Sequence, residues 1–382
     1  MLRKIARRVK LVTLDFILNP ITLDVSEKLL YWLLEKAPHI TAINIYALVK
    51  NLGILRIWDP WILRDGSEYK LFFLAGPKFK KPFWIKGIIL SATSSDFEEW
   101  TFQGLALKPD ECEWSNGRML AGSCYKENDN FYLFYSSSPK PPNLFLESIS
   151  IAMSKDCLDW QKYSTPLLTS DNKFYGTSKA TISLEEQQRF SPNGLHQQFR
   201  DPYIFKCNVT NQYLLIFSAA SANGHPFFRG CIGQATSRSI EGPYTLLEPL
   251  LYPVTEDNEG IFYEVERTQI IFKHNKYYLF FSSWVSSINA KWISNYKEFD
   301  LSHSSVYCYV ADTLEEPFIP LGIPIVPGSG RTGLYGTNFL QDEEGNWFAY
   351  GWYPENFTFE VSRKFRVIWD GEIPKILVPD KD

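Results

Sequence analysis

Alternating hydrophobic and polar positions recur five times along the chain after about residue 52. Each copy begins with a short apolar strand, turns through polar residues, and returns as a strand rich in tyrosine, phenylalanine and leucine. The returning strands are residues 69–73, 131–135, 213–217, 277–281 and 347–350. This period of two predicts an antiparallel β-hairpin in each copy.

A third strand follows the hairpin in four of the copies. It comprises residues 87–92, 148–152, 230–235 and 305–311. In the first two copies, the segments from Asp96 to Trp100 and from Asp156 to Trp160 begin a fourth, outer strand. Five similar four-stranded units predict an all-β fold, a five-bladed β-propeller. A β-sandwich of irregular hairpins is the alternative, and the matching of the five copies disfavours it.

The N-terminal part of the chain has a helical pattern instead. Residues 1–12 alternate apolar and basic positions as an amphipathic helix does, either on the protein surface or in weak contact with a membrane surface. Asp15 interrupts the apolar run that follows, so a signal peptide is not predicted. We therefore expect a short N-terminal helical extension over residues 1–51 and a propeller catalytic domain over residues 52–382.

Composition narrows the class of protein. The chain of 382 residues has a formal net charge of −4 and no basic stripe of the kind that nucleic-acid-binding proteins carry. Its six cysteines have no C-x-x-C spacing and no neighbouring histidine cluster, so we predict no metal site and no cofactor, with a structural calcium left open. The cysteines are scattered along apolar strands, as in a reduced cytoplasmic protein. We expect a monomer.

Three acidic residues lie near the first strand of three different copies. Asp59 precedes this strand in the first copy, Asp201 in the third and Glu266 in the fourth. The innermost strands of a propeller line its central channel, so these acids should converge at the axis although they are far apart in sequence. One such acid is ordinarily a solvated turn residue. Three acids at what we interpret as the same phase of a repeat indicate a site.

Glu264 and Glu266 are two residues apart, with Arg267 beside them. On a strand both carboxylates point to one face and repel each other, so at least one should have a raised pKa unless Arg267 neutralises the pair. A raised carboxyl pKa suits a general acid at neutral pH. Paired carboxylates are the usual groups that cleave glycosidic bonds, and nearby tryptophans would form an apolar wall for a sugar.

The motifs around these acids resemble glycoside hydrolase family 68, the levansucrases, and its sister family 32, the invertases, which form one clan of five-bladed propellers. Trp58-Asp59-x-Trp61 is similar to the nucleophile motif of family 68, and this resemblance implies that Asp59 is the nucleophile. Trp58 and Trp61 would belong to the apolar wall that binds the sugar. Arg200-Asp201-Pro202 resembles the Arg-Asp-Pro motif. By that resemblance Asp201 stabilises the transition state and Arg200 is a substrate ligand.

Two further motifs extend the resemblance. Glu264-Val265-Glu266-Arg267 is similar to the Glu-x-Glu-Arg motif of family 68, which implies that Glu266 is the acid/base and that Glu264 and Arg267 bind substrate. Glu113-Trp114-Ser115 resembles the second-blade motif, so Trp114 and Ser115 would contact the fructosyl unit.

The resemblance implies a retaining hydrolase or transglycosylase that acts on β-fructofuranosides such as sucrose through a covalent fructosyl-enzyme. The carboxyl groups of Asp59 and Glu266 would then lie about 5–5.5 Å apart. Pro60 departs from family 68 and is typical of families 32 and 43, so an inverting arabinofuranosidase or arabinanase is an alternative, as is a non-catalytic glycan-binding propeller. Residues 282–287 lack the arginine that family 68 uses on the glucosyl unit, which leaves the donor, the acceptor and the choice between hydrolysis and transfer open.

Overall fold

The computed structural model describes residues 55–77, 83–141, 143–178, 197–207, 209–296, 299, 301, 304–354 and 361–379. The predicted helical extension over residues 1–51, with its amphipathic segment 1–12, lies outside these residues. Among the residues that are described, no helix is both long and apolar enough to cross a membrane.

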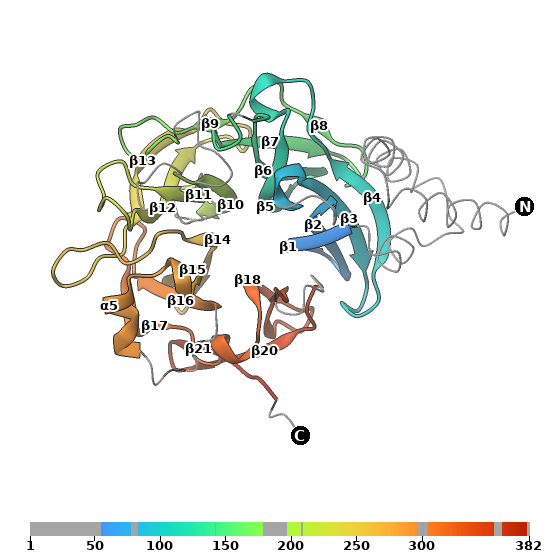
Figure 1. The fold of residues 1–382 in the computed structure, drawn as a ribbon. Helices are drawn as coiled ribbons and strands as arrows, with labels where there is room; N and C mark the ends of the chain where they lie inside the picture. Colours follow the sequence, from blue (N-terminus) through green and yellow to red (C-terminus); the bar gives the residue numbers. More distant parts are fainter. Residues whose placement is uncertain are drawn as a thin grey trace, which may run out of the picture.

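Five antiparallel sheets surround one central axis (Figure 1), which confirms the predicted five-bladed propeller. Blade 1 contains β1 (Leu55–Asp65), β2 (Glu68–Pro77), β3 (Ile88–Ser94) and β4 (Thr101–Leu107). Blade 2 contains β5 (Arg118–Glu127), β6 (Asn130–Ser138), β7 (Ser148–Ser154), β8 (Gln161–Lys162) and β9 (Leu168–Thr169). Blade 3 contains β10 (Phe199–Cys207), β11 (Gln212–Ala220), β12 (Gly230–Ser237) and β13 (Thr245–Leu251).

The last two blades complete the ring. Blade 4 contains β14 (Glu266–Lys273), β15 (Lys276–Trp284), β16 (Ser304–Ala311) and β17 (Ile319–Ile325). Blade 5 contains β18 (Tyr335–Gln341), β19 (Trp347–Trp352), β20 (Phe365–Asp370) and β21 (Ile373–Ile376). Within the described part of the chain, the single α-helix is α5 (Ala290–Ile293), in the connection between β15 and β16. The innermost strands β1, β5, β10, β14 and β18 face the axis (Figure 1).

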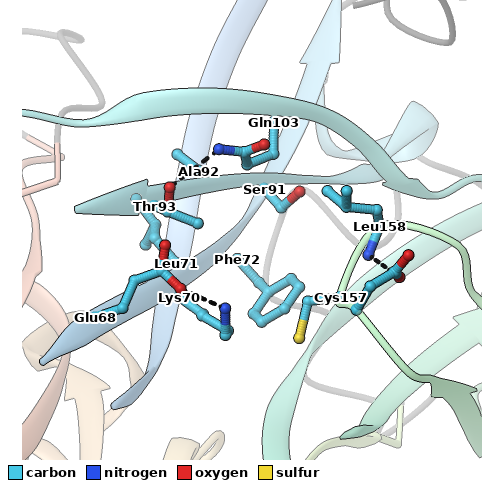
Figure 2. A pocket seen from close by; sticks show the side chains of 11 residues that line it. Glu68, Lys70, Leu71, Phe72, Ser91, Ala92, Thr93, Gln103, Cys157 and Leu158 are labelled. Carbon is cyan, nitrogen blue, oxygen red and sulfur yellow. Dashed lines mark hydrogen bonds and ion pairs between the residues drawn. The ribbon is translucent and has the colours of Figure 1, made fainter. Parts of the chain in front are cut away.

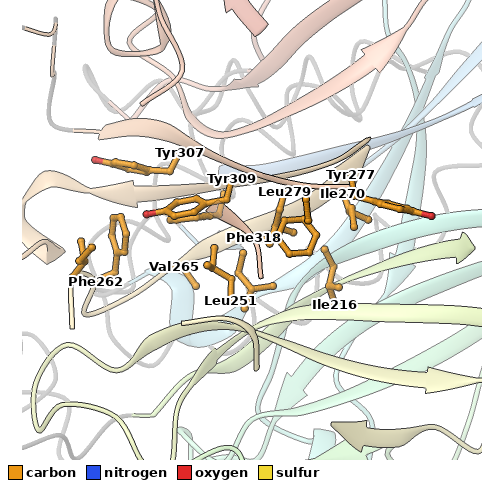
Figure 3. Packing of buried hydrophobic residues seen from close by; sticks show 14 of the residues in the cluster. Ile216, Leu251, Phe262, Val265, Ile270, Tyr277, Leu279, Tyr307, Tyr309 and Phe318 are labelled. Carbon is orange, nitrogen blue, oxygen red and sulfur yellow. The ribbon is translucent and has the colours of Figure 1, made fainter. Parts of the chain in front are cut away.

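The hydrophobic core lies between neighbouring blades. Figure 3 shows this packing where blade 3 meets blade 4, with Ile216 on β11 and Leu251 at the end of β13 facing Ile270 and Leu279 of blade 4. The middle strands β11 and β16 are buried along nearly their whole length, because both faces of a blade are covered by neighbouring blades.

The ring closes by side-chain packing between blade 5 and blade 1. Tyr69 and Phe97 of blade 1 cluster with Phe348 and Tyr350 of blade 5. The Ile62 backbone N–H donates to the Tyr350 hydroxyl at 2.9 Å. Among the described residues, all four strands of blade 5 are consecutive in the chain, and its outermost strand is β21. No strand from the N-terminal part of the described chain completes this blade, so the ring closes through side-chain contacts.

A small cavity of about 190 Å³ lies where blades 1 and 2 meet (Figure 2). Phe72 on β2 faces Cys157, which follows β7. The polar groups that line it bond to near neighbours: Lys70 Nζ lies 2.5 Å from Glu68 Oε2, for example. The cavity contains none of the predicted site residues, so it is a gap in the packing between blades.

Candidate active site

Each of the five innermost strands has a β-bulge near its start. The register shifts fall between Trp58 and Trp61, Leu120 and Gly122, Arg200 and Tyr203, Glu266 and Gln269, and Tyr335 and Asn338. In four of these bulges one residue has a left-handed backbone, and these residues are Asp59 (φ 46°), Asp201 (φ 57°), Arg267 (φ 57°) and Gly336 (φ 59°). A bulge redirects the side chain of its extra residue, and this is how the innermost strands turn functional groups toward the axis.

The alignment of the bulges corrects one prediction. Asp59 and Asp201 occupy the same left-handed position, but its equivalent in blade 4 is Arg267 and not Glu266. Glu266 pairs with Ser282 just before the bulge, as Arg200 pairs with Ser218 in blade 3. The expectation that all three acids share one phase of the repeat was therefore wrong for Glu266, which lies one residue before the left-handed position of its bulge.

The three acids nevertheless converge from blades 1, 3 and 4. Burial raises the pKa of Asp59 to about 7, the positive charge of Arg267 opposes this rise, and the negative charges of Asp201 and Glu266 add to it. Burial also raises the pKa of Asp201 to about 6, against the charges of Arg267 and Arg200. A carboxyl group responds to another in this way only at short range, so the three carboxyl groups face one space.

Arg200 bridges the two glutamates of the Glu-x-Glu-Arg motif. Its Nη2 lies 2.6 Å from Glu264 Oε1 and 2.7 Å from Glu266 Oε1. The two carboxylates do point to one side, as the period of two predicts. The guanidinium that neutralises them, however, comes from blade 3 and not from the neighbouring Arg267.

A third carboxylate, that of Glu147, binds Arg200 through its Nη1 atom. Glu147 is fully buried, and its Oε1 lies 3.1 Å from Arg200 Nη1 and 3.0 Å from Arg118 Nη2. Its Oε2 accepts the Phe199 backbone N–H at 2.9 Å. Arg118 in turn lies over the ring of Trp84, 5.0 Å from the ring centroid. The ion pairs thus continue from Arg118 through Glu147 and Arg200 to the paired glutamates.

Sequence reasoning missed Glu147 and Arg118. The available signal was a lone acidic residue at the start of the apolar third strand of blade 2, in Leu146-Glu147-Ser148. Such a residue is ordinarily a solvated strand end, so only the contact across 53 residues with Arg200 reveals its place in the site.

Arg267 lies beside Asp59 and Asp201. Its side chain is buried, and its guanidinium donates to the carbonyls of Gly122 and Pro60 at 3.2 Å each. Its backbone N–H donates to Asp201 Oδ2 at 3.1 Å. Arg267 therefore links blades 1, 2 and 3 by hydrogen bonds and supplies positive charge next to Asp59 and Asp201. Direct contact of Arg267 with a substrate stays a prediction.

Blade 5 contributes two hydrogen-bond donors that the sequence did not single out. The Trp352 indole N–H donates to Asp59 Oδ1 at 2.9 Å, and the Tyr335 hydroxyl donates to Glu266 Oε2. Burial and the charge of Glu266 raise the pKa of Tyr335 well above its usual value, so this hydroxyl stays protonated. Trp284 stacks on Tyr335 with ring centroids 3.9 Å apart.

The predicted tryptophans gather in one cluster. Trp58 and Trp61 are buried there with Tyr335 and Trp352, and Trp114 packs against the same cluster. Ser115, next to Trp114 in a short 3-10 turn at Glu113–Ser115, is buried and donates its hydroxyl to Asp110. The Trp114 indole N–H donates to the Ser164 carbonyl at 2.9 Å. The contact of Trp114 and Ser115 with a fructosyl unit stays a prediction.

The described residues contain no group of three or more histidine, cysteine, aspartate or glutamate side chains that could hold a metal ion. What they do place together are three carboxyl groups, the Arg200 guanidinium that binds Glu264 and Glu266, and a cluster of aromatic side chains. Carboxyl groups that converge beside aromatic rings are suited to cleaving a glycosidic bond. Fold and site together define a carbohydrate-active five-bladed propeller.

Comparison with known proteins shows which families the chain is similar to. Residues 61–228 match the N-terminal domain of glycosyl hydrolases family 32. This segment contains Arg200 and Asp201, whereas Asp59 and Glu266 lie outside it. No curated protein sequence matches the chain.

Solved structures share the fold at low sequence identity. An inulosucrase from Halalkalicoccus jeotgali bound to kestose has 20% identity and a TM-score of 0.64, with 85% of this chain and 87% of that chain covered. Bacillus subtilis levansucrase has 15% identity and a TM-score of 0.63, with 85% and 86% covered. A sucrose-6-phosphate hydrolase from Lactobacillus gasseri has 17% identity and a TM-score of 0.63, with 85% and 61% covered. The resemblance to the clan of families 32 and 68, which the motifs predicted, is confirmed.

Proposed function

We propose that this chain is a retaining glycoside hydrolase or transglycosylase that acts on β-fructofuranosides such as sucrose. The observation that carries the proposal is the convergence of Asp59, Asp201 and Glu266 around the arginine clamp of Arg200. Asp59 is the nucleophile, Glu266 the acid/base, and Asp201 the group that binds sugar hydroxyls and supports positive charge at the anomeric carbon.

The reaction proceeds in two displacements. In the first, a carboxylate oxygen of Asp59 bonds to the anomeric carbon while the glycosidic bond breaks, and Glu266 gives its proton to the leaving oxygen. In the second, Glu266 takes a proton from water or from a sugar hydroxyl, whose oxygen replaces Asp59 at the anomeric carbon. Water as acceptor gives hydrolysis, and a sugar hydroxyl gives transfer.

The hydrogen bonds of the two carboxyl groups support these roles. Asp59 Oδ1 accepts the Trp352 N–H, whereas Oδ2 accepts no hydrogen bond from the described residues and is available to attack. Glu266 is held through both oxygens, by Arg200 at Oε1 and by Tyr335 at Oε2. A phenol both donates and accepts, so the contact with Tyr335 can persist whether Glu266 is protonated or ionised. Two differently held carboxyl groups are what the two roles require.

The donor sugar is proposed from the relatives, and the acceptor side from the chain itself. The matched structures include an inulosucrase, a levansucrase and a sucrose-6-phosphate hydrolase, which favours a fructosyl donor. Trp284 lies in the segment where family 68 has an arginine for the glucosyl unit, and it stacks on Tyr335. An aromatic surface therefore lies beside the acid/base on the acceptor side.

Incubation with sucrose, raffinose and short arabino-oligosaccharides, with products separated by chromatography, tests the function. We expect release of glucose from sucrose and of melibiose from raffinose, with free fructose or fructosyl oligosaccharides as the second product. The Asp59→Asn variant is the matched control and should form no product. Arabinose release would favour the inverting alternative, and binding of these sugars without turnover would favour a non-catalytic glycan-binding propeller.

We further propose a cytoplasmic monomer whose partner is a small carbohydrate. All six cysteines are unpaired, including the partly exposed Cys112 and Cys124, which suits a reducing compartment. Size-exclusion chromatography with light scattering would test the monomer.

A further inference from the structure

We infer that Trp352 is a positioning residue for the nucleophile: its indole N–H fixes one oxygen of Asp59 so that the other faces the anomeric carbon. This inference rests on the proposed function. Blade 5 would then orient the attacking group, although it carries none of the predicted catalytic acids.

The first support is the contact itself. Trp352 is the last residue of β19, pairs with Tyr335 on β18, and is only 6% exposed. Its Nε1 lies 2.9 Å from Asp59 Oδ1, across 293 residues of sequence and across the junction where the ring of blades closes. Asp59 sits on a bulge with a left-handed backbone, and its carboxyl group has no hydrogen-bond partner among the described residues of its own blade.

The second support is the space that blade 5 leaves for this contact. Gly336 occupies the left-handed bulge position that Asp59 and Asp201 occupy in their blades. A Cβ atom on Gly336 would lie 3.2 Å from Trp352 Nε1 and 3.3 Å from Asp59 Oδ1. Both distances are tighter than most real contacts of a Cβ atom. The absence of a side chain at this position therefore leaves the indole and the carboxylate room to meet.

The chemistry of the indole fixes the sense of the effect. An indole N–H can only donate a hydrogen bond, so it favours the ionised form of Asp59. The other charged groups that face Asp59 are Arg267, Asp201 and Glu266, and the two acids oppose ionisation. Loss of the donor should therefore leave Asp59 protonated up to a higher pH and free to rotate.

The Trp352→Phe variant tests this, because it keeps an aromatic ring and removes the donor. We expect kcat on sucrose to fall about tenfold to a hundredfold, the usual effect of losing one hydrogen bond to a charged group, with little change in KM. The acidic limb of the pH–rate profile should move upward by about one pH unit. Trp352→His, whose Nε2 can take the place of the indole N–H, should recover much of both losses.

Trp347→Phe is the matched control, since Trp347 lies at the other end of β19, against Trp369, and should leave kcat and the pH profile unchanged. A second readout does not depend on turnover: titration of selectively labelled aspartate carboxyl carbons by NMR should show a higher pKa for Asp59 in Trp352→Phe. An unchanged Asp59 pKa in the folded variant, or a loss confined to KM, would overturn the inference. Absence of turnover in the wild type, with the pKa difference present, would refute the proposed function instead.

Discussion

Replacing Asp59 by asparagine should make the protein more stable while it removes catalysis. The carboxyl group of Asp59 has its pKa raised to about 7 by burial and by neighbouring acids, so its ionised form is disfavoured in the folded state. Above this pH, the negative charge of Asp59 therefore destabilises the folded protein. Asparagine has the same shape, accepts the hydrogen bond from Trp352, and tolerates the left-handed backbone at this position.

The pKa shift sets the size and the pH dependence of the effect. A shift from 3.8 to about 7 is roughly three pKa units, and one unit is worth about 1.36 kcal/mol, so the ceiling is about 4 kcal/mol. Asp59 is partly exposed and shares its shift with Asp201 and Glu266, so we expect about 1–3 kcal/mol. Between about pH 4 and pH 7 the unfolded state binds fewer protons at this site than the folded state does. The penalty therefore grows as the pH rises and is complete above the folded pKa.

Urea unfolding of the wild type and of Asp59→Asn at pH 4.5 and at pH 8 measures this directly. The free energy of unfolding of the variant should exceed that of the wild type at pH 8 and approach it at pH 4.5. Asp129→Asn, at an exposed turn, is the control and should change neither value. Lower stability of Asp59→Asn at pH 8, or a difference that does not depend on pH, would refute the assignment of a destabilising charge to this site.

Three other predictions concern the chemistry. The kcat/KM on sucrose should fall as the pH drops below about 7, because Asp59 must be ionised to attack, and a profile that stays flat down to pH 5 would argue against this. Glu147→Gln should lower kcat/KM about tenfold to a hundredfold, because Arg200 loses its anchor. It should also destabilise the fold by about 3–5 kcal/mol, because Arg118 is left without its buried partner, and urea unfolding would measure this. Glu266→Gln should nearly abolish sucrose cleavage but still form the covalent intermediate from a substrate with an activated leaving group, as a stopped-flow burst would show.

The hairpins and the number of blades could be predicted because each copy carries its own local signal. A strand such as residues 277–281 alternates in the sheet period and follows a polar turn, whatever the rest of the chain does. The third strand of blade 5, β20 (Phe365–Asp370), was not predicted, since Phe-Arg-Val-Ile-Trp-Asp lacks the Gly or Ser start of the other third strands. Blade 2 has its outer edge split into β8 and β9, which no pattern marks.

The sequence likewise predicted some residues of the site and missed others. Asp59, Asp201 and Glu266 could be found because each stands in a motif beside a recurring strand. The bulges could not, because a left-handed residue such as Asp201 leaves no trace in a hydrophobic pattern, and so the phase of Glu266 was misjudged. The partners of the acids were also missed. Trp352 and Glu147 act across long sequence distances, and alone each looks like an ordinary core tryptophan or strand-end acid.

The central claim is that Asp59 attacks the sugar while Glu266 serves as acid/base. A separation of the two carboxyl groups in the retaining range stays a prediction, and trapping the intermediate tests the claim more directly. The wild type is mixed briefly with sucrose, quenched in acid and digested with pepsin, and its peptides are weighed by mass spectrometry. The account predicts one fructosyl group esterified to Asp59, absent from Asp59→Asn. Turnover with no such ester, together with products of inverted configuration, or an ester on a different carboxylate, would contradict it.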